Sequence, residues 1–133
     1  MGELPLGRLR YLYLGSSDVE RDLRFYVEVL GGERMWQFEG AGAVVAAVRV
    51  AQGPWILLAD HRPPGSCLPI FAVDDLERTA SDLRGRGWVS ESGPFEVPDG
   101  PCYLFRDPSG NELALLGNVR PDVLVGRFEP RTR

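Results

Sequence analysis

One motif occurs twice in this chain, and the spacing of the copies restricts the folds that it can adopt. The first copy, YLYLGSSDVERDL, covers residues 11–23, and the second, LPIFAVDDLERTA, covers residues 68–80, so that Tyr11 aligns with Leu68. In each copy a mostly apolar run leads into a polar segment and then Asp-(Val/Leu)-Glu-Arg, the pattern of a buried strand followed directly by a helix. Two such copies in 133 residues predict two equivalent half-domains.

A second pair of segments supports the repeat. GPWILL at 53–58 aligns with GNELAL at 110–115 at the same offset, and both are apolar strands entered from a glycine turn. The alternative is two unrelated strand–helix starts, and it leaves this shared offset unexplained.

Each half continues in the same way. Residues 9–16 predict a strand, and the spacing of Ser17 and Glu20 is that of a capping box, so a helix is expected from Asp18 to the Gly31-Gly32 stop. The apolar stripe of this helix is Val19, Leu23, Tyr26, Val27 and Leu30. In the second half, residues 68–73 predict a strand, and Asp74 is expected to cap a helix over 75 to about 84, with Glu77 three residues on.

Three further strands follow each helix. They are expected at 33–40, 43–52 and 54–60 in the first half, and around 95–97, 102–106 and 112–116 in the second. The fold class is therefore α+β, with two βαβββ modules that form a curved, cup-shaped mixed sheet. We expect one domain over 1–133, with module one at about 9–60, a linker at 61–66, module two at about 67–117 and a tail at 118–133. The tail's apolar Val123–Val125 and Phe128 are expected to pack on the body or on a second subunit.

Composition argues against several classes of partner. The net charge is −4 with both signs interspersed, so there is no basic stripe for nucleic acid. No apolar run is long enough to span a membrane and no signal peptide is recognisable, which predicts a cytoplasmic protein. Cys67 and Cys102 stand in apolar strand contexts, where reduced cysteine is the ordinary case.

The motifs resemble a known family. DVER, FY and LG in the first half (residues 18–31) and FRDPSGN at 105–111 are similar to the vicinal oxygen chelate superfamily, which includes glyoxalase I, extradiol dioxygenases and bleomycin-resistance proteins. The resemblance covers roughly residues 9–117. It implies the paired-module fold, and it does not by itself specify a function.

Enzymes of that family hold a divalent metal with one side chain on the first and one on the last strand of each module. The corresponding positions here are Tyr11, Leu57, Leu68 and Ala114. Leucine and alanine provide no donor atom for a metal, and one tyrosine cannot replace the missing ligands. We therefore expect no metal and no cofactor. His61, the single histidine, is interpreted as a surface or hydrogen-bonding residue rather than a ligand.

Strand alternation indicates which side chains share the former ligand face. They are Tyr11, Tyr13, Trp55, Leu57, Ala59, Leu68, Ile70, Glu112, Ala114 and Leu116. Trp36 and Phe38 share one face of their strand, and Tyr103 and Phe105 share one face of theirs. Either pair is expected to line the mouth of the cup or to belong to the core under the helices.

An aromatic cup without metal ligands suits a planar guest. We expect a homodimer that sequesters an aromatic natural-product antibiotic, resembling the bleomycin-resistance branch, with bleomycin-, mitomycin- and enediyne-type drugs all compatible. Glu112 is the candidate partner for a cationic drug. One alternative is a metal-independent enzyme that uses Tyr11 or Glu112 as acid or base. Another is a regulatory subunit whose cup binds nothing small.

Overall fold

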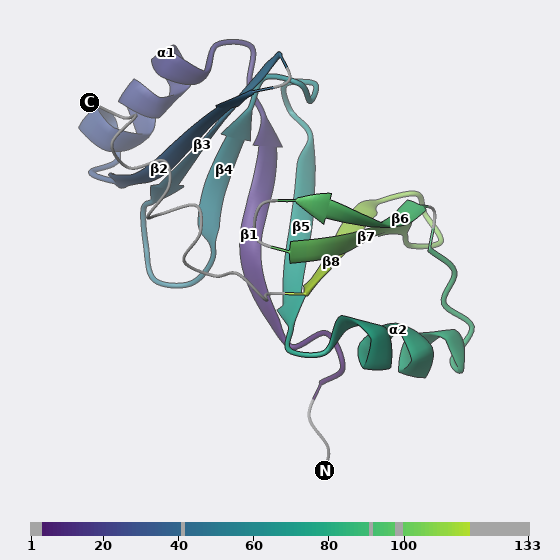
Figure 1. Ribbon diagram of the computed structural model, residues 1–133. Helices are drawn as coiled ribbons and strands as arrows, with labels where there is room; N and C mark the ends of the chain where they lie inside the picture. Colours follow the sequence, from purple (N-terminus) through teal and green to yellow (C-terminus); the bar gives the residue numbers. More distant parts are fainter. Residues whose placement is uncertain (1–3, 41, 91, 98–99, 118–133) are drawn as a thin grey trace.

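Figure 1 shows the computed structural model, which describes residues 4–40, 42–90, 92–97 and 100–117. The first half contains β1 (Arg8–Gly15), α1 (Val19–Arg24), the π-helical turn η1 (Phe25–Val29), β2 (Glu33–Gly40), β3 (Ala43–Arg49) and β4 (Trp55–Ala59). The second contains β5 (Cys67–Val73), α2 (Leu76–Arg84), β6 (Ser92–Val97), β7 (Gly100–Arg106) and β8 (Glu112–Gly117). The predicted α+β fold of two βαβββ modules on a curved mixed sheet is confirmed. The predicted tail at 118–133 lies outside the described residues.

The eight strands form one sheet in the order β2-β3-β4-β1-β5-β8-β7-β6. The first strands of the two modules, β1 and β5, pair antiparallel at its centre, so the modules join within the chain. In each module the first and last strands pair in parallel, with Tyr13 opposite Leu57 in one and Ile70 opposite Ala114 in the other. The offset that aligns Tyr11 with Leu68 also aligns the first of these pairs with the second. The two modules therefore repeat the pairing of their strands as well as their sequence.

The two α-helices begin one residue later than the sequence indicated. The N-caps are Asp18 and Asp75, whose carboxylates accept hydrogen bonds from Arg21 N and Arg78 N, both at 3.1 Å. The capping box at Ser17 and the cap at Asp74 were therefore wrong. Ser17 Oγ instead accepts a hydrogen bond from Arg21 Nη2 at 2.9 Å. An aspartate carboxylate at the cap satisfies the helix-start amide and also interacts favourably with the positive end of the helix.

The first helix changes pitch after Arg24. Leu30 N donates to Phe25 O at 3.2 Å, which is the five-residue step of a π-turn. Val29 is 67% exposed and Leu30 is 48% exposed, so Leu30 does not belong to the buried stripe predicted from the sequence.

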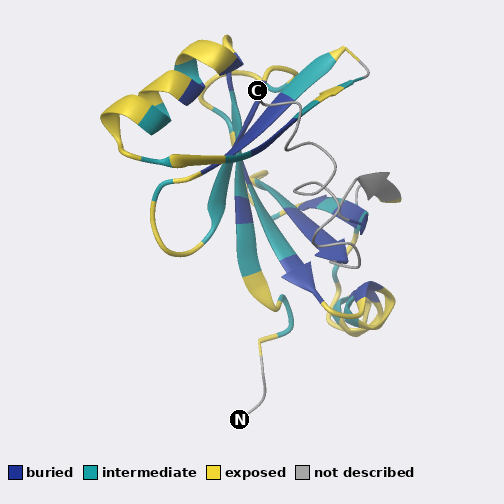
Figure 2. Cartoon of the chain, turned by 60° about the vertical axis from the view of Figure 1, so that its left-hand side comes forward, coloured by how far each residue is buried: buried dark blue, intermediate teal, exposed yellow. Residues whose placement is uncertain are grey.

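Both helices cover the same face of the sheet, one on each module. Under α1, Val19 and Leu23 pack on Ala46, Val48 and Leu58. Leu76 and Ala80 of α2 pack on Val73, Tyr103, Phe105 and Leu115. Figure 2 shows that the exposed residues of both helices lie on the sides turned away from the sheet. The opposite, concave face carries no described helix. Neither α-helix in the described ranges has the length and apolar character needed to cross a membrane.

Candidate functional site

A continuous apolar cluster lines the concave face of the sheet, which we call the cup. Its members come from β1, β2, β3, β4, β5, β7 and β8, so both modules contribute to it. The buried members are Tyr11, Trp36, Val45, Ala47, Leu57, Ala59, Leu68, Cys102, Ala114 and Leu116. Around them pack Tyr13, Met35, Phe38, Trp55, Ile70 and Leu104, which are partly buried. The partly buried residues form the surface that a ligand would meet first.

Strand register orders the cup into two rows across the sheet. One row is Trp36, Ala47, Leu57, Tyr13 and Leu68, and the other is Trp55, Tyr11, Ile70, Ala114 and Leu104. The rows are related by the sequence repeat, because Tyr13 and Leu57 in one correspond to Ile70 and Ala114 in the other. Of the four positions that correspond to metal ligands in the resembling family, Leu57 and Leu68 lie in the first row, and Tyr11 and Ala114 lie in the second.

Most of the predicted binding residues lie on the cup. Tyr11, Tyr13, Trp36, Phe38, Trp55, Leu57, Leu68 and Ala114 all belong to its cluster. The open choice between two aromatic pairs is decided by the structure: Trp36 and Phe38 line the cup, and Tyr103 and Phe105 do not.

Tyr103 and Phe105 pack on the helix side and do not line the cup. The ring of Trp88 lies 5.4 Å from the ring of Tyr103 and 5.5 Å from that of Phe105, both edge-on. Because successive side chains of a strand point to opposite faces, Cys102 and Leu104 face the cup in their place.

Among the side chains that the structure describes, the aromatic residues of the cup cluster come from one module. Tyr11, Tyr13, Trp36, Phe38 and Trp55 all come from module one, whereas module two contributes aliphatic side chains and Cys102. The ring centroids of Tyr11 and Trp36 are 6.5 Å apart in an edge-on arrangement, and those of Tyr11 and Trp55 are 6.4 Å apart. These separations are typical of favourable aromatic pairs. A flat ligand would therefore stack on the module-one side.

The residues present do not fit the divalent metal that enzymes of the resembling family hold. Leu57, Leu68 and Ala114 offer no donor atom, and Tyr11 is 4% exposed among apolar neighbours. Within the described ranges, no three His, Cys, Asp or Glu side chains come together as a candidate metal cluster.

A polar group of side chains closes one end of the cup. Tyr13 Oη and His61 Nε2 lie 3.0 Å apart and share a hydrogen bond whose donor depends on the imidazole tautomer. His61 is exposed at this rim, in agreement with its interpretation as a hydrogen-bonding residue. The guanidinium of Arg62 lies 5.8 Å from the centroid of the Tyr13 ring. Sequence analysis missed both loop residues as part of the cup, although they closely follow β4, the strand that carries Leu57.

Glu112 is not a free carboxylate. Its Oε1 accepts a hydrogen bond from Arg62 Nη2, and its Oε2 accepts one from Arg106 Nη2 at 3.4 Å. The turn between β7 and β8 holds Arg106 and Glu112 opposite each other, since Asp107 Oδ1 accepts from Ser109 N and Asn111 N. A carboxylate with two arginine partners has little remaining attraction for a cation. The expectation that Glu112 pairs with a cationic drug therefore loses its support.

Burial raises the pKa of two cup residues. Desolvation raises the pKa of Tyr13 to about 12, although the nearby Arg62 charge opposes this shift. Desolvation likewise raises the pKa of the Cys102 thiol to about 12. Both groups remain protonated at neutral pH. Tyr13 therefore offers a neutral hydroxyl to a ligand, and Cys102 is not a reactive thiolate.

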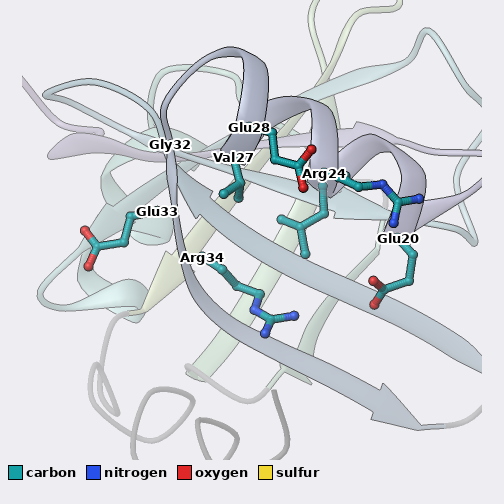
Figure 3. A pocket seen from close by; sticks show the side chains of 8 residues that line it. Glu20, Arg24, Val27, Glu28, Gly32, Glu33 and Arg34 are labelled. Atoms are coloured by element: carbon teal, nitrogen blue, oxygen red, sulfur yellow. The ribbon is translucent and has the colours of Figure 1, made fainter. Parts of the chain in front are cut away.

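A second hollow lies on the helix side of the sheet. It is an open cavity of about 540 Å³. Figure 3 shows its lining side chains between the first helix and the edge strand β2. Its lining residues are Glu20, Leu23, Arg24, Val27, Glu28, Gly32, Glu33 and Arg34. Acidic and basic side chains are interspersed around it, so it does not present one sign of charge to an ion. The cup is the stronger candidate site.

Comparison with known families agrees with this geometry. Residues 8–115 match the model of the Glyoxalase/Bleomycin resistance protein/Dioxygenase superfamily. The chain belongs to this superfamily. The match extends over both modules and ends within β8, the last strand of the cup.

The proteins that are similar to this chain carry different functional names. Methylmalonyl-CoA epimerase from Mycobacterium tuberculosis superposes with a TM-score of 0.68 at 18% identity, over 87% of this chain and 91% of the epimerase. A methylmalonyl-CoA epimerase of Streptomyces coelicolor gives 0.70 at 16% identity, over 83% and 93%. A Desulfitobacterium hafniense protein named D-aminoacyl-tRNA deacylase is 28% identical over 130 residues, covering 84% of this chain and 87% of that protein. The structural neighbours establish the fold alone.

Proposed function

We propose that this protein binds a planar aromatic natural product, such as an antibiotic, in the cup and sequesters it without a metal and without chemical change. The observation that carries the proposal is the composition of the cup: module one contributes five aromatic side chains to it, and Leu57, Leu68 and Ala114 offer no donor atom for a metal. Bleomycin-, mitomycin- and enediyne-type compounds are the candidate guests. In this proposal the protein acts in the cytoplasm as a resistance protein that holds the intact compound.

The degree of burial within the cup divides the aromatic residues into two roles. Tyr11 and Trp36 are 4% and 3% exposed and form a closed floor. Tyr13, Phe38 and Trp55 are only partly buried and offer ring faces and edges to a guest. Each stacked pair contributes about 0.5–1.5 kcal/mol beyond the burial of apolar area. A guest that touches all three gains both orientation and affinity.

The test uses the positions of the three tryptophans. Trp36 and Trp55 line the cup, whereas Trp88 packs against Tyr103 and Phe105 on the helix face. Titration with a panel of cytotoxic antibiotics should give saturable quenching of tryptophan fluorescence in the unaltered protein and in Trp88→Phe. The double variant Trp36→Phe, Trp55→Phe should lose most of the quenching. Quenching that disappears with Trp88→Phe instead would place the ligand on the wrong face and contradict the proposal.

A homodimer belongs to this proposal, since the resembling drug-binding proteins place their ligand in grooves at a dimer interface. Sedimentation equilibrium with and without the compound that quenches best measures the assembly. A mass of twice 14.7 kDa is expected. A monomeric mass at concentrations where the ligand saturates the protein would contradict the predicted homodimer. It would not contradict binding in the cup.

The second candidate function is a metal-independent enzyme of the same superfamily. The Tyr13–His61 hydrogen bond favours it, because it brings a histidine and a protonated tyrosine together at the rim of the cup. Such a pair can act as general acid and base. Relatives named as a deacylase and as epimerases show that catalysis occurs on related chains. Recovery of an altered compound, lost in His61→Gln while binding persists, would establish this function in place of sequestration.

A further inference from the structure

Two arginines meet one carboxylate at the polar end of the cup. Arg62 and Arg106 both approach Glu112, so two guanidinium groups share one carboxylate. The side chains of Arg62 and Glu112 are 17% and 25% exposed, and Arg106 is more open at 46%. The nearby carboxylate of Asp60 is exposed and accepts a hydrogen bond from Val44 N at 3.0 Å. Water screens that exposed charge more than it screens the partly buried pair.

Arg62 also retains a buried donor. A guanidinium group has five N–H donors. Arg62 Nη2 donates to Glu112, but the buried Nε has no acceptor among the residues that the structure describes. A buried donor without a partner costs free energy, which an acceptor on a bound molecule would recover. The side chain lies over the Tyr13 ring, and Tyr13 lies beside Leu57 and Leu68 on the cup.

We propose that the guest of the cup is an acid: a planar aromatic compound whose carboxylate accepts a hydrogen bond from Arg62 while its ring system stacks on the module-one side. This inference rests on the proposed function and specifies the class of ligand. The neutral Tyr13 hydroxyl adjoins the anion without repelling it. Glu112 competes with the ligand for Arg62, so it weakens binding of the acid rather than contributing to it.

The experiment compares two probes that differ in one charge, anthraquinone-2-carboxylate and anthraquinone-2-carboxamide. Their dissociation constants are measured by calorimetry for the unaltered protein, Arg62→Gln, Glu112→Gln and the control Arg49→Gln. Arg49 is 52% exposed and pairs with Glu33 at the end of β3 that is far from Arg62. Its replacement makes the same change in net charge. Thermal unfolding of each variant verifies that it is folded.

Arg62→Gln should weaken binding of the carboxylate about tenfold, the range of one charge-assisted hydrogen bond, and change binding of the carboxamide less than about twofold. Glu112→Gln should strengthen binding of the carboxylate, because Arg62 then loses its competing partner. Arg49→Gln should leave both constants unchanged.

Equal losses for both probes in Arg62→Gln, or weaker carboxylate binding in Glu112→Gln, would overturn the acidic-ligand inference and leave an aromatic binding site. Failure of both probes to bind the unaltered protein would contradict the proposed function and this inference together. If Arg62→Gln does not fold, Glu112→Gln alone decides, since the inference predicts an increase in affinity and a merely structural ion pair predicts none.

Discussion

Leu12 and Pro69 face each other across the antiparallel pair of β1 and β5, and they are equivalent residues of the internal repeat. On either side of it, Tyr11 pairs with Ile70 and Tyr13 pairs with Leu68. In the aligned copies Tyr11 is equivalent to Leu68 and Tyr13 to Ile70, so the two pairs are equivalent to each other. The sheet is therefore symmetric about the Leu12–Pro69 pair. The described side chains are not symmetric about it, since the aromatic members of the cup cluster all come from module one.

The backbone symmetry predicts that the two modules depend on equivalent core residues. Leu58 and Leu115 are 2% and 0% exposed and lie under α1 and α2, respectively. Replacement of either by alanine should lower the free energy of unfolding by about 2–5 kcal/mol, the usual cost of a buried leucine. Val89→Ala, at a side chain that is 78% exposed, is the control. Chemical denaturation measures all three, and a cost in only one module would show that the modules differ in packing.

The helix caps give a second matched pair. Asp18→Ala and Asp75→Ala each remove a carboxylate that accepts the hydrogen bond of a helix-start amide. Each variant should lose about 1 kcal/mol of stability. Asp74→Ala, one residue before the second cap, should lose much less, because Asp75 and not Asp74 is the cap. A larger loss in Asp74→Ala than in Asp75→Ala would contradict the assignment.

The repeat in the sequence contains enough information to predict the fold, because a constant offset between the copies fixes both the order and the register of equivalent strands. The repeat does not identify the helix caps, because the same offset aligns Ser17 with Asp74 and Asp18 with Asp75, and only the second pair caps the helices. The π-turn η1 could not be predicted, since Phe25 to Leu30 fit the spacing of an ordinary helix equally well.

The direction of the β7 side chains was harder to assign than the position of the strand. Tyr103 and Phe105 share a face, as the alternation indicates, but which face depends on pairing with β8. Leu104 pairs with Ala114, which places Leu104 on the cup. The contacts of His61 and Arg62 with the cup depend on the path of the loop after β4, and residue periodicity carries no information about a loop.

Stability should fall at alkaline pH. Burial raises the pKa of Tyr13 from 10.0 to about 12, so the folded state retains this proton where the unfolded chain has lost it. The stabilising effect is complete below pH 10 and is lost as the pH rises toward 12. Burial raises the pKa of Cys102 in the same way, from an ordinary value of 9.0 to about 12. Denaturation at several pH values should show a shallower fall in Tyr13→Phe, and a still shallower one with Cys102→Ala added. An unchanged slope in the double variant would contradict the assigned burial.

Ligand affinity should depend on the cup side of each module and not on the helix side. Trp55→Ala removes a partly buried ring of the cup and should weaken binding of an aromatic antibiotic about twofold to tenfold, the range of one stacking contact. Tyr103→Phe removes a hydroxyl that donates to Glu77 at 3.3 Å on the other face. It should leave the affinity unchanged. Weaker binding in Tyr103→Phe, with Trp55→Ala unaffected, would place the site under α2.

The most direct test of the account is to saturate the protein with the antibiotic that binds best, recover the compound and identify it by mass spectrometry, with metal analysis of the same protein. The account predicts one stoichiometrically bound compound of unchanged mass and no stoichiometric metal. A compound of altered mass would mean that the cup is an active site, and a stoichiometric metal would mean that it is held by residues other than Tyr11, Leu57, Leu68 and Ala114.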